Sequence, residues 1–212
     1  MKNGMIGKWI VGIALMVIMT GMASVALAGP PRGIAGFTLG DDLAKYQQRI
    51  LPDTALPVRY AESITEVEVK VESGFKTGIV AYGSCAYPEK ILRLKFKYAD
   101  DSRDFFEELV RRLKMRYGEK AEWRGDPFQN VLAWKWSFRD ANGRNLSLIV
   151  QHNRRDTDEK IGNTIKLAWM DAIEKEQLCF NKGHRQARTP KKGYAGGSGA
   201  NDHQPWEILM PN

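Results

Sequence analysis

The sequence predicts an α+β fold: one antiparallel sheet of about six strands with helices packed on one face. A hairpin over 130–152 consists of two alternating runs joined by a turn at Asn142-Gly143. Residues 66–72, 90–98 and 163–170 also alternate apolar and polar side chains, as half-buried strands do. Strands grouped in runs, rather than alternating with helices, are typical of the α+β class.

The elements are predicted in chain order as follows. A short strand-like opening covers 33–40, and Asp41 is a suitable N-cap for a helix that runs to about residue 50. Pro52 and Pro57 are expected to end this helix and begin a loop. The remaining elements are strands at 66–72, 78–82 and 90–98, a helix at 102–117 capped by Asp100 or Asp101, the hairpin, a strand at 163–170 and a helix at 171–180 capped by Asp171.

Two stretches of the predicted domain share one order of elements. Residues 41–98 and 101–169 each read as a helix followed by three strands. This order allows a structural pseudo-repeat, although the two stretches repeat no residues. A single sheet without a repeat explains the order equally well.

The first 28 residues resemble a secretory signal peptide. Lys2 and Lys8 form a positive start, 9–25 is apolar, and Ala26-Leu27-Ala28 is a small-residue cleavage site. The alternative is an uncleaved membrane anchor, because the apolar run approaches the roughly 20 residues that span a bilayer. We expect cleavage, no stable membrane insertion, and a periplasmic or secreted bacterial protein.

The predicted mature chain divides into one α+β domain over 29–182 and a disordered tail over 183–212. Residues 189–200 are rich in Gly and Lys and cannot form a core, whereas 206–210 is a short apolar patch. The whole chain carries a formal charge of +7. Much of this excess lies in the first 28 residues and the tail, so the charge does not indicate nucleic acid as a partner.

The chain contains two cysteines, Cys85 and Cys179. In an oxidising compartment an even pair predicts a disulfide, which would connect the last helix to the first half of the domain. Two free buried thiols and a redox pair are the alternatives. The redox alternative is weak because the cysteines do not form a C-x-x-C motif.

The sequence contains no recognisable catalytic, metal or cofactor motif. His184 and His203 lie in the predicted tail, so His152 is the only histidine of the domain, where it ends a strand. No Gly-rich phosphate loop follows a strand. Arg124-Gly125-Asp126 spells an integrin-binding tripeptide but is better explained as a turn. We therefore predict a non-enzymatic protein without a cofactor.

Basic side chains are expected on the outward face of the sheet. They form a candidate platform for an anionic partner, and Glu66, Glu68 and Glu72 form an acidic row beside it. The alternative is cross-strand ion pairing on a solvated face, worth about 0.2–1 kcal/mol per pair. The platform residues are Arg93, Lys95, Lys97, Lys135, Arg139 and Lys166.

Three tryptophans, Trp134, Trp136 and Trp169, occupy inward positions of the predicted strands. They are candidates for lining an apolar ligand groove. At inward positions, however, tryptophans more often belong to the hydrophobic core.

Two resemblances accompany these patterns. The opening 36–41 resembles small exported α+β domains, namely outer-membrane-assembly lipoproteins and β-lactamase-inhibitor-like modules; the lipid-bearing cysteine of the former is absent. Over most of 34–180 the chain resembles a family of uncharacterised exported proteins of sulfate-reducing bacteria. Ile34 to Gly40 and Trp123 to Phe128 carry that likeness, which implies export but no activity.

These observations favour a non-enzymatic periplasmic binding or assembly-accessory protein, with another periplasmic or envelope protein as its partner. Two other functions stay open. One is a carrier of a small apolar ligand held between sheet and helices. The other is a hydrolase, which two acids with raised pKa values in one cleft would indicate.

Overall fold

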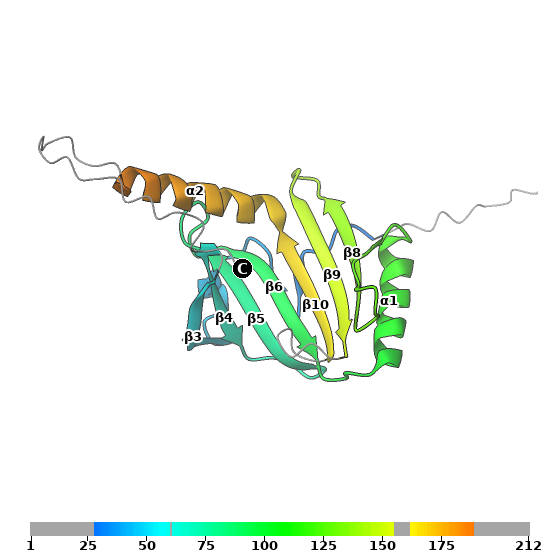
Figure 1. Cartoon of the computed structure of the whole chain (residues 1–212). Coiled ribbons are helices and arrows are strands. Elements are labelled where there is room, and N and C mark those ends of the chain that lie inside the picture. Colours follow the sequence, from blue (N-terminus) through cyan, green and yellow to red (C-terminus); the bar gives the residue numbers. More distant parts are fainter. Residues whose placement is uncertain (1–27, 60, 155–161, 189–212) are drawn as a thin grey trace, which may run out of the picture.

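A computed structural model describes residues 28–59, 61–154 and 162–188, with side chains described as far as residue 183. Its main element is an antiparallel sheet of eight strands in the order β3-β4-β5-β6-β10-β9-β8-β7 (Figure 1). The strands are β3 (Ile50–Val58), β4 (Ala61–Val69), β5 (Phe75–Gly83), β6 (Ile91–Tyr98), β7 (Glu122–Trp123), β8 (Val131–Arg139), β9 (Asn145–Asn153) and β10 (Gly162–Trp169).

The sheet consists of two four-stranded meanders that meet at their last strands. β3 to β6 form one half, β7 to β10 form the other, and β6 pairs with β10 at the centre. A short 3-10 helix, η1 (Leu43–Tyr46), precedes the first half, and α1 (Arg103–Tyr117) precedes the second. The α+β class is therefore confirmed, and each half has a helical segment followed by four strands rather than three.

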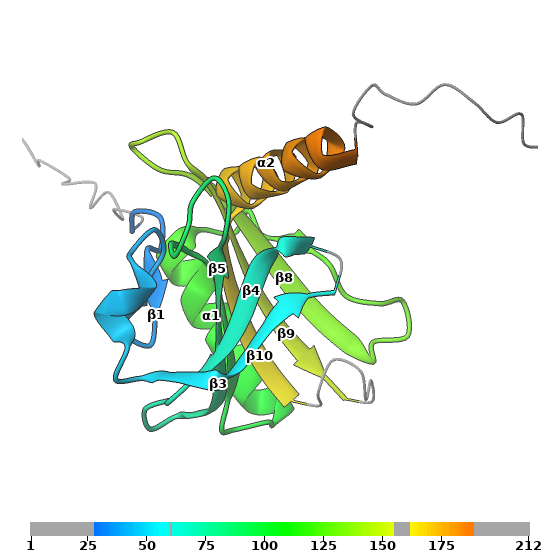
Figure 2. The same ribbon diagram turned by 90° about the vertical axis from the view of Figure 1, so that its left-hand side faces the viewer.

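One face of the sheet carries the hydrophobic core. In β8 to β10 the residues that point to this face are mostly aliphatic or aromatic, and the same face continues through Leu94 and Phe96 of β6 to Val80 of β5. α1 packs against this face through Phe106 and Val110. The small sheet of β1 (Gly33–Ile34) and β2 (Phe37–Thr38) lies on the same side (Figure 2).

The second helix, α2 (Met170–Arg188), does not share the face that α1 covers. It leaves β10 and crosses the end of the sheet where β4, β6 and β9 begin, and Figure 2 shows it on the side away from α1. The prediction that the helices pack on one face is therefore wrong. β10 ends at Trp169 and α2 begins at Met170. Because no connecting segment lies between them, the chain cannot carry α2 around to the core side.

The sheet has eight strands rather than the predicted six, and the two strands that were not predicted are those at its edges, β3 and β7. β3 contains Pro52 and Pro57, and its register with β4 shifts between Leu51 and Leu56 and again at Pro57. Proline is tolerated at a sheet edge, where one row of N–H groups needs no partner strand. β7 has two residues and is too short to show alternation.

The helix predicted over 41–50 is only one 3-10 turn. Asp41 does not cap it: its carboxylate accepts hydrogen bonds from Lys45 Nζ at 2.7 Å and from Tyr46 Oη at 2.6 Å. The cap of α1 is Ser102, whose Oγ accepts from the backbone N–H of Phe105.

The C-terminal boundary predicted at residue 182 falls inside α2, which continues to Arg188. The rest of the predicted tail, 189–212, and the predicted signal peptide up to residue 27 lie outside the described residues. Neither helix in the described part of the chain is long and apolar enough to span a membrane.

Candidate functional site

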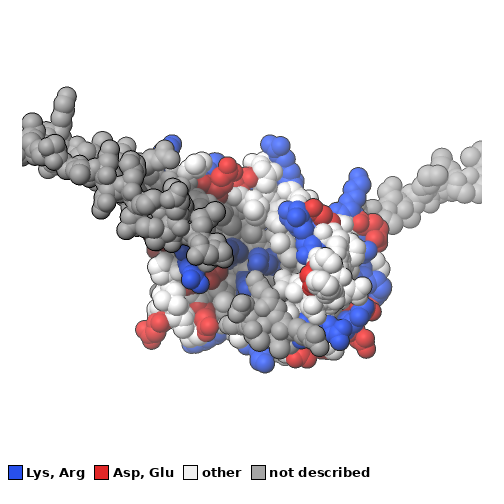
Figure 3. Space-filling view, in the orientation of Figure 1, with Lys and Arg blue, Asp and Glu red and all other residues white. Residues whose placement is uncertain are grey.

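The face of the sheet opposite α1 carries a basic hollow. Its volume is about 510 Å³, and Lys and Arg side chains gather near the middle of this face (Figure 3). Arg93, Arg124, Lys135 and Lys166 line it, and no carboxylate stands among its described lining residues. Between the cations lie Ala133, Ser147, Ile149, Gln151 and Ala168 of the sheet, and Met170 and Ile173 of α2 form a wall at one end.

The structure places the residues of the predicted platform on one face of the sheet. Alternation along the strands places all six predicted cations on the face away from α1. Arg93, Lys135 and Lys166 line the hollow, whereas Lys95 and Lys97 lie beside it on β6 and Arg139 lies at the far end of β8. The structure therefore concentrates the site around three of the six predicted residues.

Arg124 belongs to the hollow although its tripeptide was interpreted only as a turn. The backbone N–H of Arg124 donates to the Ala133 carbonyl at 2.9 Å, which extends the pairing of β7 with β8 by one residue. Its side chain therefore projects to the same face as Ala133 and Lys135. The sequence signal was Glu122-Trp123-Arg124, a short alternating run too brief to identify as a strand.

Carboxylates form ion pairs with two of the lining cations from outside the hollow. Glu66 accepts from Arg93 at 2.5 Å, and Glu122 lies 2.7 Å from Arg124. The Arg93–Glu66 pair is the cross-strand ion pairing expected as the alternative explanation of this face, whereas Glu122 and Arg124 are neighbours on the same strand. Lys135 has no ion pair among the described residues, so the charge of the hollow is only partly compensated.

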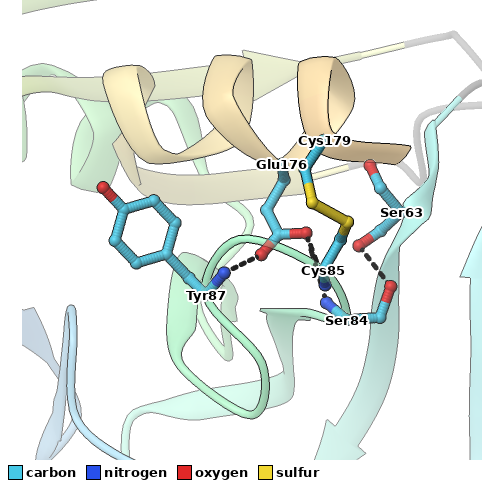
Figure 4. The surroundings of a disulfide bond; sticks show 6 residues. All are labelled: Ser63, Ser84, Cys85, Tyr87, Glu176 and Cys179. Atoms are coloured by element: carbon cyan, nitrogen blue, oxygen red, sulfur yellow. Dashed lines mark hydrogen bonds between the residues drawn. A yellow bond between two sulfur atoms is a disulfide. The ribbon is translucent and has the colours of Figure 1, made fainter. Parts of the chain in front are cut away.

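Buried Glu176 on α2 holds the wall of the hollow in place. Figure 4 shows its carboxylate pointing into the loop after β5. Oε2 accepts from the backbone N–H groups of Ser84 at 3.3 Å and Cys85 at 2.9 Å, and Oε1 accepts from that of Tyr87. Gly83 makes room for this contact, because a Cβ there would lie 2.3 Å from Oε1.

The predicted disulfide between Cys85 and Cys179 is present, with the two Cα atoms 6.0 Å apart (Figure 4). It joins α2 to the loop that Glu176 binds, and so connects the last helix to the first half of the chain. A second anchor lies at the start of α2, where Asp171 accepts hydrogen bonds from Asn145 at the beginning of β9. Asp171 therefore binds the sheet instead of capping the helix.

The three candidate groove tryptophans belong to the core side of the sheet, not to the hollow. Trp136 is 2 % exposed, and its Nε1 donates to the Gly118 carbonyl at 3.1 Å. Trp134 packs edge-on against Trp123 at 5.2 Å, and Trp169 packs partly buried against the same core. These contacts assign the three rings to packing rather than to a ligand groove.

His152 also has a structural environment. It is buried at the end of β9, its ring faces Phe106, and its Nδ1 lies 2.8 Å from Asn163 Oδ1. The Asn163 amide nitrogen donates to the carbonyls of Asp100 and Ser102. The amide oxygen therefore faces His152, and Nδ1 carries the hydrogen. His152 thus helps to fix the start of α1.

Hydrogen bonds lower the pKa of several described carboxylates. Each one whose pKa shifts clearly is shifted downward, because hydrogen bonds from neighbouring groups outweigh the cost of burial. Arg111 and Arg112, for example, lower the pKa of Glu108 to about 2 through their hydrogen bonds to its carboxylate. Within the described residues, no three His, Cys, Asp or Glu side chains lie close enough to hold a metal ion.

No family model, curated protein or solved structure matches this chain.

Proposed function

We propose that this chain is a non-enzymatic exported protein that binds an anionic partner in the basic hollow of its open sheet face. The hollow carries the proposal, because four cations line it and its described lining has no carboxylate. Complementary charge steers the encounter of two partners and disfavours wrong ones. Another protein of the bacterial envelope is the partner class that we infer.

Export is part of the same proposal. The pattern of residues 1–28 is that of a cleaved signal peptide, and the Cys85–Cys179 disulfide fits an oxidising compartment.

Native mass measurement on a gently prepared periplasmic extract of the producing cells tests the function. We expect the protein in a complex heavier than its mature monomer, and we expect the Lys135→Glu/Lys166→Glu variant to be monomeric. Reversing two charges in one site replaces attraction by repulsion toward an anionic partner.

Arg139→Glu is the matched control, because Arg139 lies on the same face of β8 outside the hollow. It should retain the complex. A wild-type protein that is monomeric under these conditions, or a complex that survives the double charge reversal, would contradict the proposed function.

A further inference from the structure

The cations of the open face lie in a row that runs across the strands. In the registered pairs, Lys95 of β6 is opposite Lys166 of β10, Lys166 is opposite Ile149 of β9, and Ile149 is opposite Lys135 of β8. Directly paired residues point to the same face of a sheet. Arg124, beside Ala133, continues the basic surface at β7.

Carboxylates mark both ends of this row. Lys135 is opposite Glu122 of β7, and on the other side Lys95 is opposite Ile79, which is opposite Glu68 of β4. The transverse row is therefore basic in the middle and acidic at its two ends. Such an arrangement repels an anion that extends past either end, and it limits the length of the segment that fits.

The length of the basic part follows from strand spacing. With Arg124 included, which lies on β7 beside Glu122, the cations extend over four steps of the sheet order from β6 to β7, and at about 4.8 Å each these steps give a basic surface about 19 Å long. An extended peptide advances about 3.3 Å per residue, so about six residues cover this distance. Met170 and Ile173 of α2 flank the row on one side.

We infer that the hollow is a docking site for an acidic segment of a partner protein, about six residues long, extended and lying across the strands. The inference rests on the proposed function and specifies its partner. Charge complementarity selects acidic side chains, and the apolar Ile149, Met170 and Ile173 accommodate the backbone and the carbon stems of the segment. A small polyvalent anion would use the same cations without needing the length of the row.

Fluorescence anisotropy with labelled oligoglutamates tests this inference on the oxidised mature protein at low ionic strength. Hexaglutamate should bind and hexalysine should not. The affinity should rise from tri- to hexaglutamate and then level off, because longer peptides reach the carboxylates at the ends of the row. An affinity that rises as steeply beyond six residues as before contradicts the bounded row.

Variants separate the site from general charge effects. Lys135→Glu/Lys166→Glu should weaken hexaglutamate binding by about tenfold or more, whereas Arg139→Glu should change it by about twofold at most. Lys166→Glu would face Lys95 and create an opposite-charge pair, whereas Lys135→Glu would face Glu122 and create a like-charge pair, so the thermal midpoint of the double variant is measured together with binding. If its thermal midpoint falls, Lys135→Gln/Lys166→Gln replaces it in the same titration.

Tripolyphosphate distinguishes failure of this inference from failure of the proposed function. If tripolyphosphate binds the wild type but not the double variant, and hexaglutamate does not bind, the acidic segment is wrong and anion binding stands. If neither probe distinguishes the wild type from the double variant, both proposals are overturned.

Discussion

Glu176 is a fully buried carboxyl group whose described hydrogen-bond partners are all backbone N–H groups. Glu176→Gln keeps the shape of the side chain but turns one amide NH₂ toward backbone donors. An unsatisfied buried donor costs about 1–3 kcal/mol, so we expect the free energy of unfolding to fall by that amount. Urea denaturation of the oxidised protein measures it.

Glu174→Gln is the control for this change, because Glu174 is exposed on the same helix. Its effect should stay within about 0.5 kcal/mol, as is usual for surface substitutions. Equal urea midpoints for the two variants would show that Glu176 does not stabilise the loop of Ser84 to Tyr87.

Tyr98 predicts a pH dependence at the alkaline end. Its ring packs against Phe75 at 5.0 Å and Phe105 at 4.9 Å, and burial raises its pKa to about 12. The unfolded chain has a tyrosine pKa of about 10. Neutral Tyr98 therefore contributes its full stability below about pH 10, and this contribution, about 2 kcal/mol, is lost as the pH rises to about 12.

Tyr98→Phe isolates this effect from the other groups that titrate in the same range. The difference in unfolding free energy between wild type and variant should shift in favour of the variant between about pH 9 and pH 12. Parallel stability curves for the two proteins over that interval would rule out a raised Tyr98 pKa.

At the scale of elements, α2 depends on contacts distant in sequence. The disulfide closes a loop of 94 residues. In the chain-entropy model it lowers the entropy of the unfolded state and so raises the free energy of unfolding by about 4–5 kcal/mol. We expect reduction to lower the free energy of unfolding by up to that amount. Urea denaturation with and without dithiothreitol measures the difference.

The Cys85→Ser/Cys179→Ser variant completes this experiment. It should match the reduced wild type and should not respond to dithiothreitol. A reductant effect of the same size in the variant would mean that the loss of stability has a source other than the disulfide.

Elements with strong local patterns were predictable, and elements at the edges of the sheet were not. The helix 102–117 and the hairpin 130–152 carry regular apolar spacing, and α1, β8 and β9 confirm them within a few residues. β3 resembled a loop because Pro52 and Pro57 interrupt it, and only pairing with β4 makes it a strand. An edge strand needs fewer local signals, because only one of its sides must form hydrogen bonds.

At the scale of the whole molecule, the core is continuous across the two halves. Leu94 of β6 pairs with Leu167 of β10 at the centre of the sheet, and both are completely buried. We therefore expect the described domain to unfold in one cooperative transition.

Two spectroscopic probes test this expectation. The tryptophans of the described residues all lie in or beside the second half of the sheet, at Trp123, Trp134, Trp136 and Trp169, so their fluorescence reports on that half. Far-UV circular dichroism reports on both halves. Coincident urea midpoints are expected, and separate midpoints would indicate that the halves unfold independently.

The sequence by itself determined the α+β class, the faces of the strong strands and the pairing of Cys85 with Cys179. It also placed Arg93, Lys135 and Lys166 on one face. These features follow from alternation, helical spacing and cysteine count, which are properties of short stretches or of composition.

Only the tertiary structure decided which strands are neighbours, where α2 lies and which cations share the hollow. The pairing of β6 with β10 sets Lys95 opposite Lys166, and the pairing of β7 with β8 brings Arg124 beside them. Strand order arises from packing between segments distant in the chain. No local sequence pattern predicts strand order, so the site forms only when the sheet assembles.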